Sequence, residues 1–281
     1  DYVEDVAMYR PGGFHPVNLG DVLGHKYKVI NKLGNGGFAT VWLARVLGEQ
    51  RYVAVKIPRA DSSNREILIL TYLQSVANHL NIANLLDTFT IAGPNGTHNC
   101  LVSEAGGPNL RAISKSGKPL PISFVRPAAQ QLAECVASLR SAGICHGDLT
   151  YSNVLFDIKD LQQWSEVETY QHLGTPEAAV SAISYSNFNI GLLSGGIRIA
   201  DFGEAFYTNS PPAGLGTPAS YFAPEMLFGY QPSPASDVWA LGCLIFEMHT
   251  SRIFAPTGFG TVVEALGITI EALGALPEAW Q

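Results

Sequence analysis

Two short polar strings in this chain carry residues that could do chemistry. HGDLTYSN begins at His146 and holds Asp148 and Asn153, five residues apart, and DFG begins at Asp201 after a short apolar strand. An Asp shortly before an Asn can place a base and a metal ligand on one tight loop, and a second Asp can hold another metal position. We therefore predict phosphoryl transfer from ATP, with Asp148 as the base and with Asn153 and Asp201 as Mg²⁺ ligands.

Because DFG occurs by chance in many proteins, this prediction needs other parts of an ATP site. The segment from Leu33 to Val41, LGNGGFATV, has Gly34 and Gly36 in a Gly-x-Gly turn. Glycines let a backbone approach phosphates closely. The flanking residues alternate as strands do, so the turn is predicted at a hairpin tip, which disfavours a dinucleotide site with a helix after the glycines. Taken alone, a Gly-x-Gly string is more often an ordinary turn.

A lysine and a glutamate follow the glycine turn. Lys56 comes at the end of an apolar strand, RYVAVKI, and we expect it to point into a cleft, where its charge needs a partner. Glu66 lies in the first turn of a helix predicted from Ser62 to Leu73. Glu66 could simply favour that helix terminus, and Lys56 could be a solvated strand residue. With the other motifs present, we favour an ion pair.

These motifs together resemble a eukaryotic-type protein kinase. Residues 4–44, with the lead-in YRPGGFHPVNLGD and the loop KLGNGGFATVWLA, resemble the SR-protein kinase family, which acts on serine/arginine-rich proteins, and its fungal branch in particular. The resemblance runs from Glu4 to Trp280 apart from an insert. It implies an α+β, bilobal kinase-like fold with a β-rich N-lobe and a mainly helical C-lobe.

The resemblance also implies roles for single residues. Lys56, positioned by Glu66, would bind the α- and β-phosphates and join Asp148, Asn153 and Asp201 in catalysis. Ser103 would stand at the back of the adenine site. The implied nucleotide-binding residues are Leu33, Gly34, Gly36, Val41, Ala54, Lys56, Glu66, Glu104, Gly106 and Leu155. The implied cofactors are ATP and Mg²⁺.

Further residues are expected to support the catalytic loop. The resemblance implies that His146 is structural and packs beneath Phe202, that Thr217 contacts Asp148, and that Asp237 holds the loop backbone. We also expect a long helix after Pro127, and a buried helix capped by Ser236.

Two positions depart from the kinase pattern. Gly147 replaces the usual Arg, so control by phosphorylation of the activation segment is not expected, and Thr150 replaces a Lys that neutralises the migrating phosphate. Losing one such transition-state donor costs other enzymes a factor of about 10²–10³ in rate. The leading hypothesis is a serine/threonine protein kinase acting on Arg/Ser-rich proteins. The alternative is a weak or silent pseudokinase that serves as a nucleotide-binding scaffold.

The predicted organisation is a lead-in at residues 1–26, an N-lobe at 27–103 and a C-lobe at 104–281. The stretch from Asn153 to Asp201 is longer than one hairpin requires, so a polar insert is placed at about 159–194. In it, LQQWSEVETYQHL is expected to form one or two helical turns, and SAISYSNFNIGLLSGG a loop. The C-lobe is expected to be truncated at Gln281, which would leave apolar residues of the helix after Asp237 exposed and the chain poorly soluble.

Composition limits the remaining function classes. The 281 residues are 47% hydrophobic with a net charge of −7, which disfavours disorder and nucleic acid as the main ligand. No apolar run approaches the ~18 residues of a membrane helix. The four cysteines lie in apolar surroundings, so we expect reduced thiols in a cytoplasmic and nuclear protein. The expected partner is a protein substrate such as an Arg/Ser-rich splicing factor, with no direct nucleic-acid or membrane partner, bound by a monomer.

Overall fold

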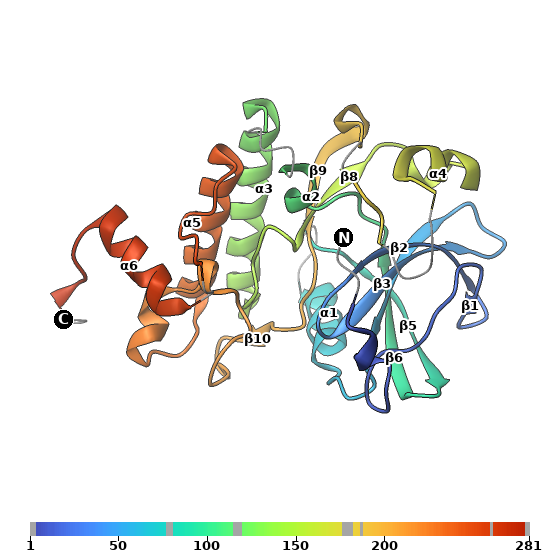
Figure 1. The fold of residues 1–281 in the computed structure, drawn as a ribbon, viewed down its shortest axis with the longest axis horizontal. Coiled ribbons are helices and arrows are strands. Elements are labelled where there is room, and N and C mark those ends of the chain that lie inside the picture. The colour runs from blue at the N-terminus through green and yellow to red at the C-terminus, as the bar shows by residue number, and fades with distance from the viewer. Residues whose placement is uncertain are drawn as a thin grey trace. The chain divides into compact units, whose positions relative to one another are not determined.

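The computed structural model describes residues 4–76, 81–114, 120–175, 182–185, 188–258 and 261–278 (Figure 1). The chain divides into two compact units. The first comprises Asp1–Thr71, Ala83–Gly107 and Asp157–Ser194, and the second comprises Tyr72–Ile82, Pro108–Phe156 and Gly195–Gln281. The first is rich in strands and the second is mainly helical, which confirms the predicted α+β, bilobal class.

One antiparallel sheet of six strands forms the centre of the first unit, in the order β1-β2-β3-β4-β6-β5. Its strands are β1 (Val22–Leu23), β2 (Tyr27–Asn35), β3 (Ala39–Val46), β4 (Tyr52–Pro58), β5 (Leu85–Gly93) and β6 (Gly96–Glu104). The predicted hairpin at the glycine turn is confirmed, because β2 and β3 flank it. The register pairs Val41 with Lys56 and Leu43 with Ala54, so these four side chains share one face of the sheet.

The opposite face of the sheet is covered by the N-terminal segment. Val17 and Leu23 pack with Trp42, Val53 and Val55 in a buried cluster. A short 3₁₀ helix, η1 (Val6–Met8), comes before them in the chain. Close by in sequence, Glu4 forms an ion pair with Lys32 of β2 that is almost completely shielded from solvent, with exposed side-chain fractions of 2% and 0%. The lead-in is therefore an integral part of this unit.

The insert packs on the first unit, although the sequence analysis placed it within the second lobe. Its described part contains η2 (Leu161–Gln163), α4 (Glu166–Leu173) and η3 (Ile190–Leu192). A capping box between Ser165 and Glu168 fixes the start of α4. Residues 176–181 and 186–187 of the predicted insert lie outside the described residues. The helical turns expected in its first half are confirmed. The loop predicted for residues 181–196 is too long, because η3 lies within it and β9 (Leu193–Ile199) begins before its expected end.

The contacts of the insert are both apolar and polar. Leu161, Trp164 and Leu173 are buried against Ile30 and Leu43 of the sheet. Gln162 forms a reciprocal pair of hydrogen bonds with the backbone of Tyr52, at 2.6 Å to the N–H and 3.1 Å to the carbonyl oxygen. The backbone N–H of Ile183 donates to the carbonyl oxygen of Lys32 at 2.8 Å. These contacts attach the insert to β2, β3 and β4.

Two long helices, α3 (Ile122–Ser141) and α5 (Pro234–Thr250), run side by side in the second unit (Figure 1). The unit also contains a two-stranded sheet of β7 (Ile144–Cys145) and β10 (Phe206–Tyr207). A second pair of strands, β8 (Val154–Ile158) and β9, flanks the insert. Four shorter helices also belong to this unit: α2 (Leu110–Ser114), η4 (Ala219–Tyr221), η5 (Pro224–Phe228) and α6 (Val262–Leu273). The remaining helix, α1 (Arg65–Val76), follows β4 in the chain.

Two helix boundaries differ from the sequence prediction. Helix α3 begins at Ile122 rather than after Pro127, which lies inside it. A proline near a helix start disturbs few hydrogen bonds, so five helical residues can precede it here. Helix α5 is capped by Ser233, and Ser236, the third residue of the helix, completes the capping box. Both serines take part in the cap, but the N-cap residue is Ser233 and not the expected Ser236.

All four cysteines are free and buried, which confirms the expectation of reduced core thiols. Burial raises the pKa of the Cys100, Cys135 and Cys145 thiols to about 12. On α5, Val238 and Phe246 are exposed, whereas Leu244 is buried. Among the described residues, no helix combines the length and apolar character of a membrane span.

Candidate functional site

The glycine turn leaves open space beside its backbone. A Cβ atom added at Gly34, Gly36 or Gly37 would meet no atom within 4 Å. The turn is closed by the Gly36 N–H, which donates to the carbonyl oxygen of Ala39 at 2.9 Å. The backbone can therefore be approached by a phosphate group, and the strand that follows the turn excludes the strand–turn–helix geometry of a dinucleotide site.

Lys56 and Glu66 form the predicted ion pair. The Lys56 Nζ donates to a Glu66 carboxylate oxygen at 2.6 Å, and their side chains are 18% and 12% exposed. Glu66 lies in the first turn of α1, as predicted. Lys56 pairs in register with Val41, which is close to the glycine turn along β3. This partly buried pair fixes the direction of a flexible lysine side chain, which projects from the strand next to β3.

The other residues predicted to bind the nucleotide divide between the units. Leu33, Val41 and Ala54 lie on the sheet of the first unit. Leu33 packs against the insert cluster, the buried group that contains Leu161, Trp164 and Leu173. Glu104 is the last residue of β6, and its carboxylate accepts from the Asn84 side chain at 3.5 Å, whereas Gly106 is buried. Leu155 belongs to β8 and forms a bridge with Asn109 in the second unit. Their roles stay predictions.

Asp148 and Asn153 meet on one loop, as their spacing predicts. The Asn153 Nδ2 donates to the backbone oxygen of Asp148 at 2.8 Å and to its Oδ2 at 2.9 Å. Among the described residues, the buried Oδ1 of Asp148 has no hydrogen-bond partner. Burial and the Asp201 carboxylate raise the pKa of Asp148 to about 7, although the bond from Asn153 acts in the opposite direction. A buried oxygen without a donor fits a base that receives a substrate hydroxyl.

Asp201 is held next to this loop by its neighbours in sequence. The Ala200 N–H donates to the Asn153 carbonyl oxygen at 2.8 Å. His146 packs edge-on against Phe202 with ring centroids 4.8 Å apart, which confirms the structural part expected of it. Asp201 itself has a left-handed backbone with φ 64°, which an Asp tolerates at a sharp turn. The amide oxygen of Asn153 and the carboxylate of Asp201 are hard oxygen donors, the type that Mg²⁺ prefers.

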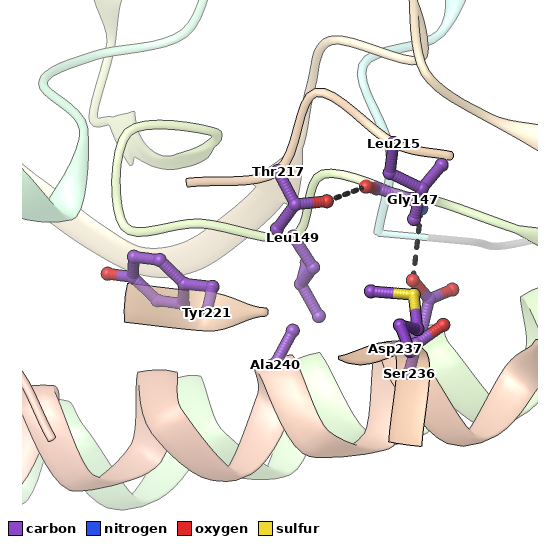
Figure 2. Close-up of a pocket in the computed structure, with 9 residues that line it drawn as sticks. Gly147, Leu149, Leu215, Thr217, Tyr221, Ser236, Asp237 and Ala240 are labelled. Atoms are coloured by element: carbon purple, nitrogen blue, oxygen red, sulfur yellow. Dashed lines mark hydrogen bonds between the residues drawn. The ribbon is translucent and has the colours of Figure 1, made fainter. Parts of the chain in front are cut away.

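Asp237 anchors the catalytic loop from below, as predicted. Its carboxylate accepts from the backbone N–H of His146 at 2.6 Å and from that of Gly147 at 3.0 Å. Figure 2 shows Asp237 beneath Gly147 at the edge of a small cavity lined by residues of α5, the loop and the segment after Asp201. Two backbone donors fix the loop that carries Asp148.

Gly147 is required by the local geometry. Its φ is 77°, and a Cβ atom there would lie 2.6 Å from the carbonyl oxygen of Glu204. The Thr217 hydroxyl donates to the Gly147 carbonyl oxygen at 2.6 Å (Figure 2). The structure therefore shows the Thr217 bond on Gly147 rather than on Asp148, which was the expected partner. The observed partner is the residue directly before the expected one, because the carbonyl group of Gly147 faces the Thr217 hydroxyl.

Two further residues support this loop and the segment after Asp201. The Tyr221 hydroxyl accepts from the Tyr151 N–H at 3.4 Å and also bonds the Glu247 carboxylate. Glu204, directly after the DFG string, accepts from the Gly216 N–H at 3.2 Å. These contacts join residues twelve or more positions apart, so residue type and spacing did not predict them.

Comparisons with known proteins agree with this geometry. The family model described as a protein kinase domain matches residues 27–263. A serine/threonine protein kinase of Aspergillus fumigatus is 31% identical, with 98% of this chain and 71% of that protein aligned. The serine/threonine-protein kinase SRPK of Physarum polycephalum is 29% identical, over 99% of this chain and 74% of that protein. Protein kinase dsk1 of Schizosaccharomyces pombe is 37% identical over 64% of this chain and 34% of its own length.

Proposed function

The chain belongs to the protein kinase family as an ATP-dependent serine/threonine kinase, and we propose that its substrates are Arg/Ser-rich proteins, which it phosphorylates on serine. A matching kinase domain and relatives named as serine/threonine kinases support the enzyme rather than a silent scaffold. The observation that carries the activity is the loop on which Asn153 holds Asp148 by two hydrogen bonds. The substrate class is supported by the SR-protein-kinase-like lead-in and by the relative named SRPK.

The residues present fit ATP and Mg²⁺. The open glycine turn and the fixed ammonium group of Lys56 would bind the phosphates from the first unit. In the second unit, Asn153 and Asp201 would hold Mg²⁺, since their oxygens are the donors this ion prefers. When bound, the ion neutralises charge on the phosphate oxygens.

Asp148 would act on the protein substrate. Its Oδ1 has no donor among the described residues, so a serine hydroxyl can occupy that position and give up its proton there. The contact from Asn153 to Oδ2 leaves the carboxylate little freedom to rotate. An oriented base of this kind contributes about 10²–10⁴ in rate.

Thr150 limits the rate in this proposal. It is 5% exposed and carries no charge, so it cannot neutralise the migrating phosphate as the Lys of other kinases does. We propose a slow but real transfer. We also propose that the protein acts as a monomer in the cytoplasm and nucleus, with a protein substrate and no direct nucleic-acid or membrane partner. The buried thiols and the net charge of −7 support this part of the proposal.

The proposed substrate class is tested with three matched peptides. The protein is incubated with Mg-ATP and peptides built of Arg-Ser, Lys-Ser or Arg-Ala repeats, and transferred phosphate is measured. We expect transfer to the Arg-Ser peptide at a rate well above that to Lys-Ser, and none to Arg-Ala. Equal rates on Arg-Ser and Lys-Ser would refute the arginine preference, and transfer to neither would refute the kinase activity of this chain.

A further inference from the structure

Gly147 belongs to a closed circuit of contacts in the second unit. On one side, the backbone at Glu204 packs so closely that a Cβ at Gly147 would lie 2.6 Å from the Glu204 carbonyl oxygen. The Glu204 carboxylate then reaches along the segment and accepts the N–H of Gly216 at 3.2 Å. The next residue, Thr217, returns to Gly147 through its hydroxyl at 2.6 Å. Four residues, Gly147, Glu204, Gly216 and Thr217, therefore form one circuit of contacts.

Glu204 is the member of this circuit that joins two distant parts of the segment. Gly216 follows Glu204 by twelve residues, and the intervening stretch is mostly irregular, with several exposed residues. A Cβ at Gly216 would lie 3.4 Å from the Glu204 carboxyl carbon, so the Glu204 carboxylate packs directly against the Gly216 backbone. Within the described part of the chain, the Glu204 carboxylate is the hydrogen-bond partner of the Gly216 N–H, so removing it would leave Thr217 beside a less fixed neighbour.

We propose that Glu204 is a positioning residue that holds Thr217 against the catalytic loop and so orders the surface that receives the protein substrate. The inference rests on the proposed kinase function. Thr217 bonds the carbonyl oxygen of the residue before Asp148, and Asp237 bonds the N–H of that same residue. The loop is thus held from both sides, and Glu204 supports one of them. Glu204 contacts neither the nucleotide residues of the first unit nor the predicted Mg²⁺ ligands through any hydrogen bond among the described residues.

The kinetic test compares Glu204→Ala with Glu204→Gln. The amide of Gln keeps an oxygen acceptor for Gly216, whereas Ala removes it. We expect kcat/KM for the Arg-Ser peptide to fall about tenfold in Glu204→Ala and to stay within about twofold of wild type in Glu204→Gln. The Kd for ATP and the Tm should stay unchanged in both. The control is Glu134→Ala, an exposed carboxylate of the same unit that bonds only Gln130 on helix α3.

A second readout does not depend on activity. Hydrogen exchange of the 214–217 backbone should be faster in Glu204→Ala than in wild type and in Glu204→Gln. If wild type transfers no phosphate, the proposed function fails. The exchange data then still show whether Glu204 holds the 214–217 backbone in place. If Glu204→Ala has the same kcat/KM and the same exchange rate of the 214–217 backbone as wild type, the inference is overturned. A Glu204→Gln variant as impaired as Glu204→Ala would also overturn it.

Discussion

The Asp237 carboxylate accepts the backbone N–H of Gly147 at 3.0 Å, across 90 residues of sequence. It accepts the N–H of His146 as well, at 2.6 Å. Burial raises the pKa of Asp237, but the two N–H donors and His146 favour its charged form. Because two backbone N–H groups of the catalytic loop donate to this one carboxylate, the loop is fixed in position relative to helix α5. The position of Asp148 therefore depends on a residue that does not touch the substrate.

We predict that Asp237→Asn lowers both stability and activity. The amide keeps one acceptor, so its NH₂ group faces a backbone N–H and leaves a buried donor unpaired, which costs about 1–3 kcal/mol. The free energy of unfolding and kcat should both fall, while the Kd for ATP changes little. Urea unfolding and steady-state kinetics measure this. The control Asp160→Asn changes an exposed, left-handed residue that Asn accepts, and it should behave as wild type. Equal unfolding midpoints for Asp237→Asn and wild type would contradict the anchoring role.

The second prediction concerns the insert. Trp164 is 8% exposed within the insert cluster and lies against His172, with ring centroids 4.5 Å apart. Trp164→Ala should lower the free energy of unfolding by about 3–5 kcal/mol, since a large buried ring is lost. Thermal unfolding and limited proteolysis measure the loss. Val167→Ala, at a residue of helix α4 that is 64% exposed, is the control and should change little. An unchanged Tm in Trp164→Ala would show that the insert does not stabilise the first unit.

The third prediction is a pH dependence from Glu4. Burial alone would raise its pKa, but hydrogen bonds from Lys32 and Tyr9 outweigh burial and lower the pKa below the ordinary 4.5. A lowered carboxyl pKa gives stability that is present above the ordinary value and is lost as pH falls through the lowered one. Wild type should therefore lose stability more steeply than Glu4→Gln as the pH falls through and below the ordinary carboxyl pKa of 4.5.

Urea unfolding across this pH range measures the difference. At neutral pH, Glu4→Gln should be less stable by about 3–5 kcal/mol, because the buried Lys32 loses its ion pair with Glu4. The matched control is Glu166→Gln, whose pair with Lys28 is more exposed, with side-chain fractions of 31% and 38%. That variant should lose about 1 kcal/mol or less. The same pH profile in wild type and Glu4→Gln would rule out the linkage.

The fourth prediction concerns Thr150. Thr150→Lys should raise kcat, by up to about 10², with little change in the Kd for ATP, because the new charge acts on the migrating phosphate. Thr150 is buried, so Thr150→Met serves as a control of similar bulk without charge and should not raise kcat. Steady-state kinetics at saturating ATP separate the two. A fall or no change in kcat for Thr150→Lys would show that another cation already fills this role.

The sequence was most informative where a feature depends on short spacing or on strand register. Asp148 and Asn153 lie on one tight loop, so their five-residue spacing alone brings them together. Lys56 lies on an apolar strand and Glu66 at a helix start, and their pairing needs only that the two elements be neighbours. The chemistry of these residues could therefore be predicted before the fold was seen.

Features set by long-range packing could not be predicted in the same way. The large apolar side chain of Trp164 predicts burial but not its partners. Only the folded structure shows that it lies in the cluster that contains Ile30 and Leu43. Ser233 and Ser236 are equally good caps by type, and the backbone of the helix start decides between them. The Glu204 contact to Gly216 depends on the path of an irregular segment, which carries no periodic pattern.

The central claim is that Asp148 accepts the proton of a substrate serine. The direct test measures phosphate transfer from Mg-ATP to the Arg-Ser peptide by wild type and by Asp148→Ala, together with the Kd for ATP. We predict that Asp148→Ala abolishes transfer and leaves the Kd within about threefold of wild type, because Lys56 and the glycine turn belong to the other unit. Glu134→Ala, an exposed carboxylate change, should retain full transfer. Equal transfer by wild type and Asp148→Ala would contradict the account.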